Sequence, residues 1–246
     1  MFTLPSEAKI GGGRLGALPI IVDFLRTIQV RDLIDFAVPP HPLHDVTHGD
    51  CIEALLCAIF LGTHTLFHVE QTLEPYDLER LFGKKGIESG HFNDTRLGEA
   101  LDALYAKTPE LFASIVSQAI EAFQVIIKRL HLDTTNIALY GSYDNPLEFL
   151  LPEDHIPSVP NYGKSKIGRS DLKQLVFGMT MMQEGIPIYG RTRDGNTSDV
   201  VEFRHHMEIL ASMLKDLQDV ILVADSKLCT GPTLHQAYSL GSISMS

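Results

Sequence analysis

The sequence has few cysteines and no long apolar stretch. The three cysteines, Cys51, Cys57 and Cys229, are few and odd in number, which fits a reducing cytoplasm better than a disulfide framework. No apolar run approaches the ~20 residues that a membrane-spanning helix needs. The segment from Met1 to Gly13 also lacks the cationic stretch and apolar core of a signal peptide. These absences predict a cytoplasmic protein without a membrane segment.

Basic residues are also scarce. Lysine and arginine total 20 against 31 aspartates and glutamates, which gives a formal net charge of −11. This balance argues against a simple nucleic-acid-binding module, whose phosphate contacts require Lys and Arg. One stretch, Asn161 to Asp194, reverses it with six basic residues against three acidic ones. Such a stretch can contact a phosphate backbone, although on charge alone a solvated face is the preferred interpretation.

The remaining composition is that of a soluble globular protein, with 44% hydrophobic and 21% charged residues. We expect a flexible N-terminus over residues 1–14 and a helical N-terminal domain over residues 15–130. Thr47 with an acid at Asp50 is a capping signal, and Thr108-Pro109-Glu110 starts a long helix predicted over Leu111 to Leu130. Other helices are predicted over Leu18–Ile28, Arg31–Val38, Cys51–Leu61, Leu66–Leu73, Leu78–Phe82 and Leu97–Tyr105.

The pattern changes at His131, where β-branched and aromatic residues begin to alternate with polar ones. A loop is expected over Gly141 to Gly163, and a helix over Val200 to Leu217. Residues 131–246 therefore have the predicted order β-β-β-α-β, and the fold class is α+β or α/β. The predicted strands are Leu132–Tyr140, Leu172–Met182, Ile186–Thr192 and Val220–Ala224.

Two aspartates occupy positions where strands place functional side chains. Asp133 lies within the first strand, and Asp225 directly follows the fourth. Ligands of open α/β sheets collect near the carboxyl ends of strands. If the first and fourth strands are neighbours, the two carboxylates converge and repel each other unless a cation lies between them. Such a pair suits Mg²⁺, and two ions ~3.5–4 Å apart can serve phosphodiester chemistry.

Each aspartate also has a simpler interpretation. An Asp after a strand is often a turn former or a helix cap, and Asp133 could cap or pair with a buried Arg. A phosphotransfer enzyme with a nucleophilic Asp133 would have a second Asp two residues on, where Thr135 stands. The order of elements between the two aspartates favours the paired interpretation.

A zinc site is the other metal-binding alternative. The spacing of the candidate ligands does not match that of zinc fingers, and the helix that carries the two cysteines is apolar enough to be buried. His205 and His206 are adjacent on a helix, so they point to different faces and make poor co-ligands. The candidate zinc ligands are Cys51, Cys57, His64 and His68.

Several motifs, in the same order along the chain, resemble those of insertion-sequence DDE transposases, which have an RNase H-like catalytic domain. His131–Thr135 resembles the motif of the first aspartate, and Val223–Ser226 that of the second. Gly163–Gln174 resembles the family's G-x-S-K-D-x-R-P-D-L-K-Q motif, from which it departs at Ile167 and Ser170. Gly195–Asp199 matches the G-N-T-S-D turn, and Asn93–Leu104 resembles the helical N-terminal domain of one branch.

The resemblance implies metal-dependent cleavage and strand transfer of DNA at transposon ends. Asp133 and Asp225 would then be the catalytic residues that hold Mg²⁺ or Mn²⁺. The implied contacts to DNA come from Lys164, Lys166, Arg169 and Lys173. The competing interpretation is structural, with Arg169 and Asp171 paired to each other.

One departure from the family concerns its third carboxylate, a Glu on a helix downstream of the second Asp. The residues after Asp225 contain neither Glu nor Asp. We therefore expect a C-terminally truncated, partial RNase H-like domain over residues 131–246, inactive alone, with an uncovered sheet edge beside Val220–Ala224. A homodimer, or a second polypeptide with the missing part, would be the protein partner. The alternative is a non-catalytic DNA-binding or dimerisation module in the helical half, residues 15–130.

Overall fold

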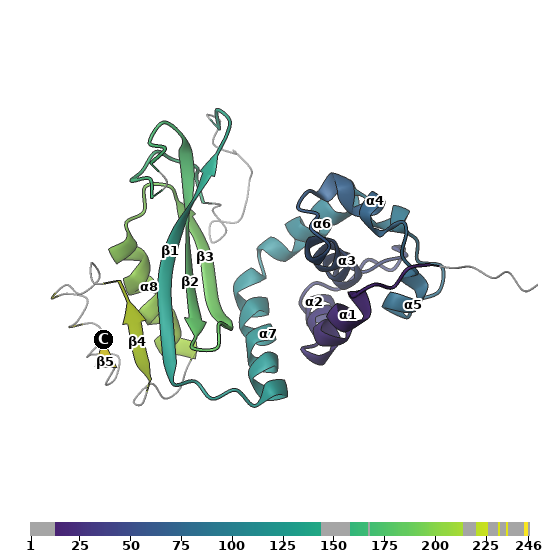
Figure 1. The fold of residues 1–246 in the computed structure, drawn as a ribbon, viewed down its shortest axis with the longest axis horizontal. Helices are drawn as coiled ribbons and strands as arrows, with labels where there is room; N and C mark the ends of the chain where they lie inside the picture. Colours follow the sequence, from purple (N-terminus) through teal and green to yellow (C-terminus); the bar gives the residue numbers. More distant parts are fainter. Residues whose placement is uncertain are drawn as a thin grey trace, which may run out of the picture. The chain divides into compact units, whose positions relative to one another are not determined.

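The chain folds into two compact units, Met1–Phe123 and Gln124–Ser246. They are described here from a computed structural model, drawn as a ribbon in Figure 1. The structure describes residues 13–143, 158–166, 168–213, 220–225, 231, 235 and 244–245. Each unit is considered by itself below.

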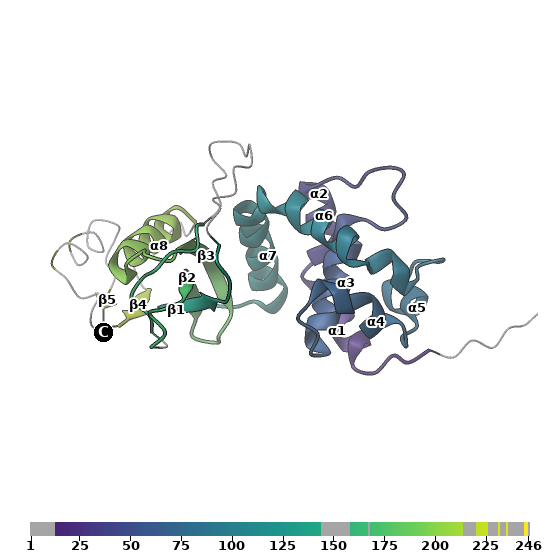
Figure 2. The ribbon, with the colours of Figure 1, turned by 90° about the horizontal axis from the view of Figure 1, so that it is seen from above.

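The first unit is built from helices, as the sequence predicts (Figures 1 and 2). Its longest buried helix is α3, His48–Phe60, which begins at a capping box between Thr47 and Asp50. The Thr47 side chain accepts from the backbone N–H of Asp50, and the Asp50 carboxylate accepts from that of Thr47. The other helices are α1 Leu18–Thr27, α2 Val30–Ala37, η1 Leu66–His68, α4 Val69–Leu73, α5 Leu78–Phe82, η2 Ser89–Phe92, α6 Asp94–Tyr105 and α7 Thr108–Phe123.

Two groups of buried side chains form the core of this unit. The larger joins α3 to the short helices that follow it, through residues such as Cys57, Val69 and Phe92. The smaller packs α1 and α2 against α6 and α7, through residues such as Ile34 and Leu111. Burial of these apolar surfaces is the main stabilising contribution, at about 25 cal/mol per Å² removed from water.

The helix predicted over Leu111 to Leu130 is wrong at its C-terminal end. Helix α7 ends at Phe123, and Gln124 has a left-handed φ of 51° that stops the helix. Strand β1 then begins at Arg129, earlier than predicted. The reason is visible in the burial pattern, because Leu130, Leu132 and Thr134 are buried at every second position. Leu130 therefore follows the alternation of a strand and not the spacing of a helix.

The second unit is a mixed sheet with the predicted element order. Strand β1, Arg129–Leu139, pairs antiparallel with β2, Lys173–Met182, which pairs antiparallel with β3, Pro187–Asp194. The helix α8, Asp199–Met213, precedes β4, Ile221–Ala224, and β4 lies parallel to β1. The sheet order is β3-β2-β1-β4-β5. Most of the predicted loop, residues 144–157, lies outside the described residues.

Helix α8 packs on one face of the sheet. The buried residues of β2 occur at every second position and are Gln174, Val176, Gly178, Thr180 and Met182. Thr180 shares a hydrogen bond with His206 of α8, so this is the face that α8 covers. Strand β1 therefore directs Thr134 towards α8 and Asp133 towards the opposite side of the sheet.

The prediction of an uncovered edge beside Val220–Ala224 is wrong in part. A short strand β5, Ser244–Met245, pairs in parallel with Ile221 and Leu222 of β4 and covers that part of the edge. Among the described residues, no helix has the length and apolar character required to cross a membrane.

Candidate functional site

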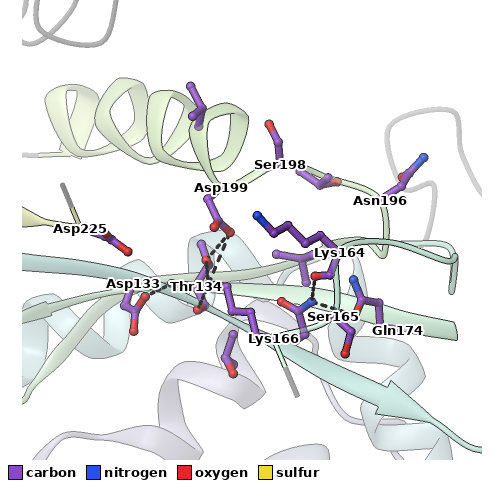
Figure 3. A pocket seen from close by; sticks show the side chains of 15 residues that line it. Asp133, Thr134, Lys164, Ser165, Lys166, Gln174, Asn196, Ser198, Asp199 and Asp225 are labelled. Atoms are coloured by element: carbon purple, nitrogen blue, oxygen red, sulfur yellow. Dashed lines mark hydrogen bonds and ion pairs between the residues drawn. The ribbon is translucent and has the colours of Figure 1, made fainter. Parts of the chain in front are cut away.

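The two predicted aspartates lie side by side at the end of the β1–β4 pair. The last residues paired between these strands are Leu132 and Ala224. Asp133 and Asp225 are the next residue of each strand, so they stand level with one another. Both are exposed, and Figure 3 shows them at the same end of the sheet. Their adjacency is the arrangement expected if the first and fourth strands are neighbours.

A cavity of about 780 Å³ extends from the two aspartates along β1 and β2 to the start of α8. Most of the residues that line it have polar or charged side chains, which can bind a hydrophilic ligand. The segment before β2 contributes Lys164 and Lys166, and the turn before α8 contributes Asn196 and Ser198. The charged groups at its surface are therefore three carboxylates, including Asp199, and two ammonium groups.

The carboxylate of Asp133 is oriented by its own strand. Asp133 Oδ1 accepts a hydrogen bond of 2.7 Å from the backbone N–H of Thr134. The Thr134 side chain points the other way and is 7% exposed. Its hydroxyl donates to Asp199 Oδ1 at 2.6 Å and accepts from Lys166 Nζ at 2.6 Å. Thr134 therefore connects the first aspartate to the start of α8 and to the segment before β2.

Gly195, the first residue of the G-N-T-S-D turn, packs closely against β2 beside the cavity. A Cβ at Gly195 would overlap the backbone oxygens of Gln174 and Asn161, which bridge β2 to the preceding segment. Gln174 is buried, and its amide donates to the Gly195 oxygen at 2.8 Å and accepts from Asn136 Nδ2 at 2.8 Å. The turn and strand β2 can approach closely because Gly195 has no side chain.

The four side chains predicted to contact DNA differ in the protein groups that they already contact. Lys166 Nζ donates to the Thr134 oxygen and hydroxyl and lies 3.5 Å from Asp199 Oδ1. Lys173 Nζ donates to the Tyr143 oxygen at 2.9 Å. The ammonium of Lys164 has no ion pair or hydrogen bond to a described residue, and it lies in the cavity.

Arg169 lies outside the cavity and forms a two-bond pair with Asp171. Its Nε and Nη2 atoms donate to the two carboxylate oxygens at 2.8 and 2.7 Å. The hydrogen bonds from Arg169 hold the pKa of Asp171 below its usual range. The alternative interpretation, in which these residues pair with each other, describes the observed contact.

The residues present fit a hydrated divalent cation. Mg²⁺ keeps several waters and is commonly bound through one or two carboxylates plus substrate phosphates. The pair Asp133 and Asp225 has this composition, and both carboxylates are exposed enough to leave room for water. In the described part of the chain, no three His, Cys, Asp or Glu side chains are grouped to hold a metal. Asp199 bonds Thr134 on the α8 side of β1, away from the side that Asp133 faces.

The alternative zinc site does not form. Cys51 and Cys57 are buried in α3, and burial raises their pKa values to about 11 and about 12. His68 instead shares a 2.7 Å hydrogen bond with Thr65 at the protein surface. Buried thiols of this kind behave as small apolar side chains.

Sequence reasoning did not find Thr134 and Asp199 as residues of the site. Asp199 belongs to the G-N-T-S-D motif, and Thr134 follows the first aspartate. The available signal was a polar residue at an inward-facing position of β1. Because 65 residues separate Thr134 from Asp199, only the folded chain shows that they meet.

Parts of the chain are similar to known proteins. Residues 12–117 match the model of a domain of unknown function, DUF4277. No curated protein matches. A solved structure titled as a pre-cleavage Mos1 transpososome is 12% identical, with a TM-score of 0.31, over 81% of this chain and 59% of that chain. A Mos1 mariner paired-end complex with Mn is 13% identical, with a TM-score of 0.30, over 79% and 57%. The chain thus spans less than two thirds of these proteins, and the similarity does not establish a shared fold.

Proposed function

We propose that this chain is a DDE-type transposase of the insertion-sequence kind, acting on DNA phosphodiester bonds through Asp133 and Asp225. One observation carries the proposal: the two aspartates follow the last paired residues of adjacent parallel strands and lie at one polar cavity. Their separation of 92 residues along the chain makes a shared local role, such as one turn, impossible. The sheet order and the motif order support an RNase H-like unit over residues 131–246 and a helical domain before it.

The two carboxylates would hold Mg²⁺ or Mn²⁺. When bound, the cation supplies Lewis-acid stabilisation of charge at the phosphodiester and lowers the pKa of a bound water. The chain's own part is to fix the two carboxylates at the rim of the sheet and to leave the cavity open for a DNA strand. Lys164 is placed to neutralise a phosphate of that strand, since its ammonium lies in the cavity.

The resemblance implies a third carboxylate, and no third His, Cys, Asp or Glu is grouped with Asp133 and Asp225 among the described residues. We infer that these two carboxylates alone hold the cation weakly, because the geometry of the ion is fixed by all of its ligands together. Transposon-end DNA is the proposed partner. A second copy of the chain, or a second polypeptide, would complete the active assembly.

The test combines metal binding with DNA nicking. Mn²⁺ binding to the purified chain is measured by electron paramagnetic resonance, and nicking is followed on a supercoiled plasmid that carries the DNA flanking the gene. We expect Asp133→Asn and Asp225→Asn to abolish both. Asp171→Asn is the matched control, since Asp171 is an exposed carboxylate that pairs with Arg169 outside the cavity.

Three outcomes separate the candidate functions. Metal binding and nicking that depend on both aspartates support the transposase. DNA binding with no metal binding supports the non-catalytic module of the helical half. Mn²⁺ affinity that is equal in the wild type, Asp133→Asn and Asp171→Asn contradicts the proposal.

A further inference from the structure

The hydroxyl of Thr134 is fully engaged by two charged groups from distant parts of the chain. It donates to Asp199 Oδ1 at 2.6 Å, across 65 residues, and accepts from Lys166 Nζ at 2.6 Å, across 32 residues. Lys166 also donates to the backbone oxygen of Thr134 at 2.6 Å. A threonine that is 7% exposed and bonded at its hydroxyl and its carbonyl has little freedom to move.

The same residue orients the first aspartate through its backbone. The N–H of Thr134 donates to Asp133 Oδ1 at 2.7 Å. A small rotation of the Thr134 peptide would therefore turn the Asp133 carboxylate with it. The side chain of Thr134 lies on the α8 face and that of Asp133 on the other face, so Lys166 and Asp199 do not reach the Asp133 carboxylate directly.

We propose that Lys166 and Asp199 are positioning residues, which hold the Asp133 carboxylate in its metal-binding orientation through Thr134. This inference rests on the proposed function. It assigns Lys166 a different role from Lys164, because the Lys166 ammonium is occupied by Thr134 and Asp199. Lys164 is left as the phosphate contact of this segment.

The two charged groups that contact Thr134 have opposite charges, which supports their proposed role in orienting it. Lys166 and Asp199 have opposite charges, lie 3.5 Å apart and have side chains 40% and 38% exposed. An exposed pair of this kind contributes little to stability by itself. Its value lies in geometry, since the ammonium and the carboxylate together fix which way the Thr134 hydroxyl points.

The first experiment measures Mn²⁺ affinity of the full chain by electron paramagnetic resonance. Thr134→Val and Asp199→Ala are each expected to weaken Mn²⁺ binding roughly tenfold, as does the loss of a residue that orients a metal ligand, whereas Thr134→Ser stays within about twofold of the wild type. Thr192→Val, an exposed threonine of β3, is the matched control. Hydrogen exchange of β1 verifies that each variant is folded, and Asp199→Ala tests the same link if Thr134→Val does not fold.

The second experiment separates Lys166 from Lys164. Binding to a labelled 30-base-pair duplex of arbitrary sequence is measured at several salt concentrations. We expect Lys164→Met to reduce the salt slope by about one, as for a lost phosphate contact. Lys166→Met is expected to leave the slope unchanged and to weaken Mn²⁺ binding.

The outcomes distinguish this inference from the proposed function. If Asp133→Asn abolishes Mn²⁺ binding but Thr134→Val and Asp199→Ala bind as the wild type does, the positioning role is wrong and the metal site stands. If Lys166→Met lowers the salt slope with Mn²⁺ affinity intact, Lys166 is a DNA contact and the inference is overturned. If the wild type binds no Mn²⁺, or Asp133→Asn binds it equally well, the proposed function fails and this inference with it.

Discussion

Gly178 of β2 lies directly against His206 of α8. A Cβ built on Gly178 would stand 2.9 Å from His206 Nε2 and 2.9 Å from Glu202 Cγ, and both of these residues are fully buried. His206 is held between Thr180, at 2.9 Å, and Glu202, at 3.0 Å. Arg193 Nε lies 3.1 Å from the second carboxylate oxygen of Glu202. The missing side chain at Gly178 thus lets α8 pack closely on β2, in the helix whose first residue bonds Thr134.

Replacing Gly178 with alanine should therefore destabilise the second unit. The added methyl group meets two buried polar side chains, and overpacking of this kind costs about 1–3 kcal/mol. Native-state hydrogen exchange of β2 and α8 measures the change locally. Gly190→Ala is the matched control, since a Cβ there would meet Phe177 at 3.4 Å, an ordinary contact. Equal protection of the two variants would show that α8 adjusts without cost.

Most of the fold could be predicted from local patterns. The alternation of Leu130, Leu132 and Thr134 marks a strand, and Thr47 with Asp50 marks the start of α3. The prediction failed where two patterns overlap, at residues 124–130, because an apolar run such as Ile126-Ile127 suits a helix or a strand. The left-handed conformation of Gln124 ends α7 there. Strand β5 was missed because a two-residue strand has no pattern of its own.

The site was predicted in part, for a physical reason. The adjacency of Asp133 and Asp225 requires that the first and fourth strands are neighbours, which the order of elements along the chain favours and the sheet order shows. The links among Lys166, Thr134 and Asp199 depend on side chains that meet from distant segments, and no spacing along the chain encodes them. The role of Gly178 could not be predicted from the sequence for the same reason, since it depends on the helix that packs on β2.

The burial of the Glu53 carboxyl group in α3 predicts an unusual pH dependence of the free energy of unfolding. Glu53 is 1% exposed, and its nearest cation is Arg31, whose Nη1 lies 3.4 Å from Oε2. Burial raises the pKa of Glu53 above its usual value, against the attraction of Arg31. The folded state then binds the proton more tightly than the unfolded state. The free energy of unfolding should therefore fall as the pH rises through the interval above 4.5.

The variant Glu53→Gln has no proton to lose and should lack this loss of stability. We expect its free energy of unfolding, relative to that of the wild type, to be higher at pH 7 than at pH 4. Urea unfolding across this range measures the difference, with Glu74→Gln, an exposed glutamate of the same unit, as control. Parallel pH profiles for Glu53→Gln and the wild type would contradict the expectation.

The thiols of α3 should be chemically inert in the folded chain. Cys51 and Cys57 are 0% exposed, and burial raises the pKa of Cys51 to about 11 and that of Cys57 to about 12. At pH 8 roughly one Cys51 thiol in a thousand would be the reactive thiolate. In a Cys229→Ser background, iodoacetamide should label neither cysteine until urea unfolds α3. Labelling of the folded chain at the rate of a free peptide thiol would show that α3 opens readily.

Asp50, one turn before Glu53, should have the opposite effect on acid stability. Burial alone would raise the pKa of Asp50, but hydrogen bonds from the Thr47 N–H and from Lys84 Nζ, each 2.9 Å long, lower it overall. A carboxyl group whose pKa is lowered on folding contributes stability above its unfolded value of 3.8, and this is lost as the pH falls through the folded value. Lys84→Met removes one of the causes. Since the Lys84 side chain is 38% exposed, solvent screening limits the expected loss at pH 7 to about 0.5–1 kcal/mol.

That loss should shrink as the pH falls from 3.8 through the lower pKa of the folded state, because the Asp50 carboxyl group then becomes protonated in the folded protein as well and no longer attracts Lys84. Hydrogen exchange of α3 at pH 7 and urea unfolding at pH 7 and pH 3 measure the two halves of the prediction. Lys85→Met is the matched control, since Lys85 is an exposed neighbour with no ion pair to a described residue. A Lys84→Met deficit that is equal at pH 7 and pH 3 would mean that Lys84 stabilises the unit by packing its side-chain carbons and not by its charge beside Asp50.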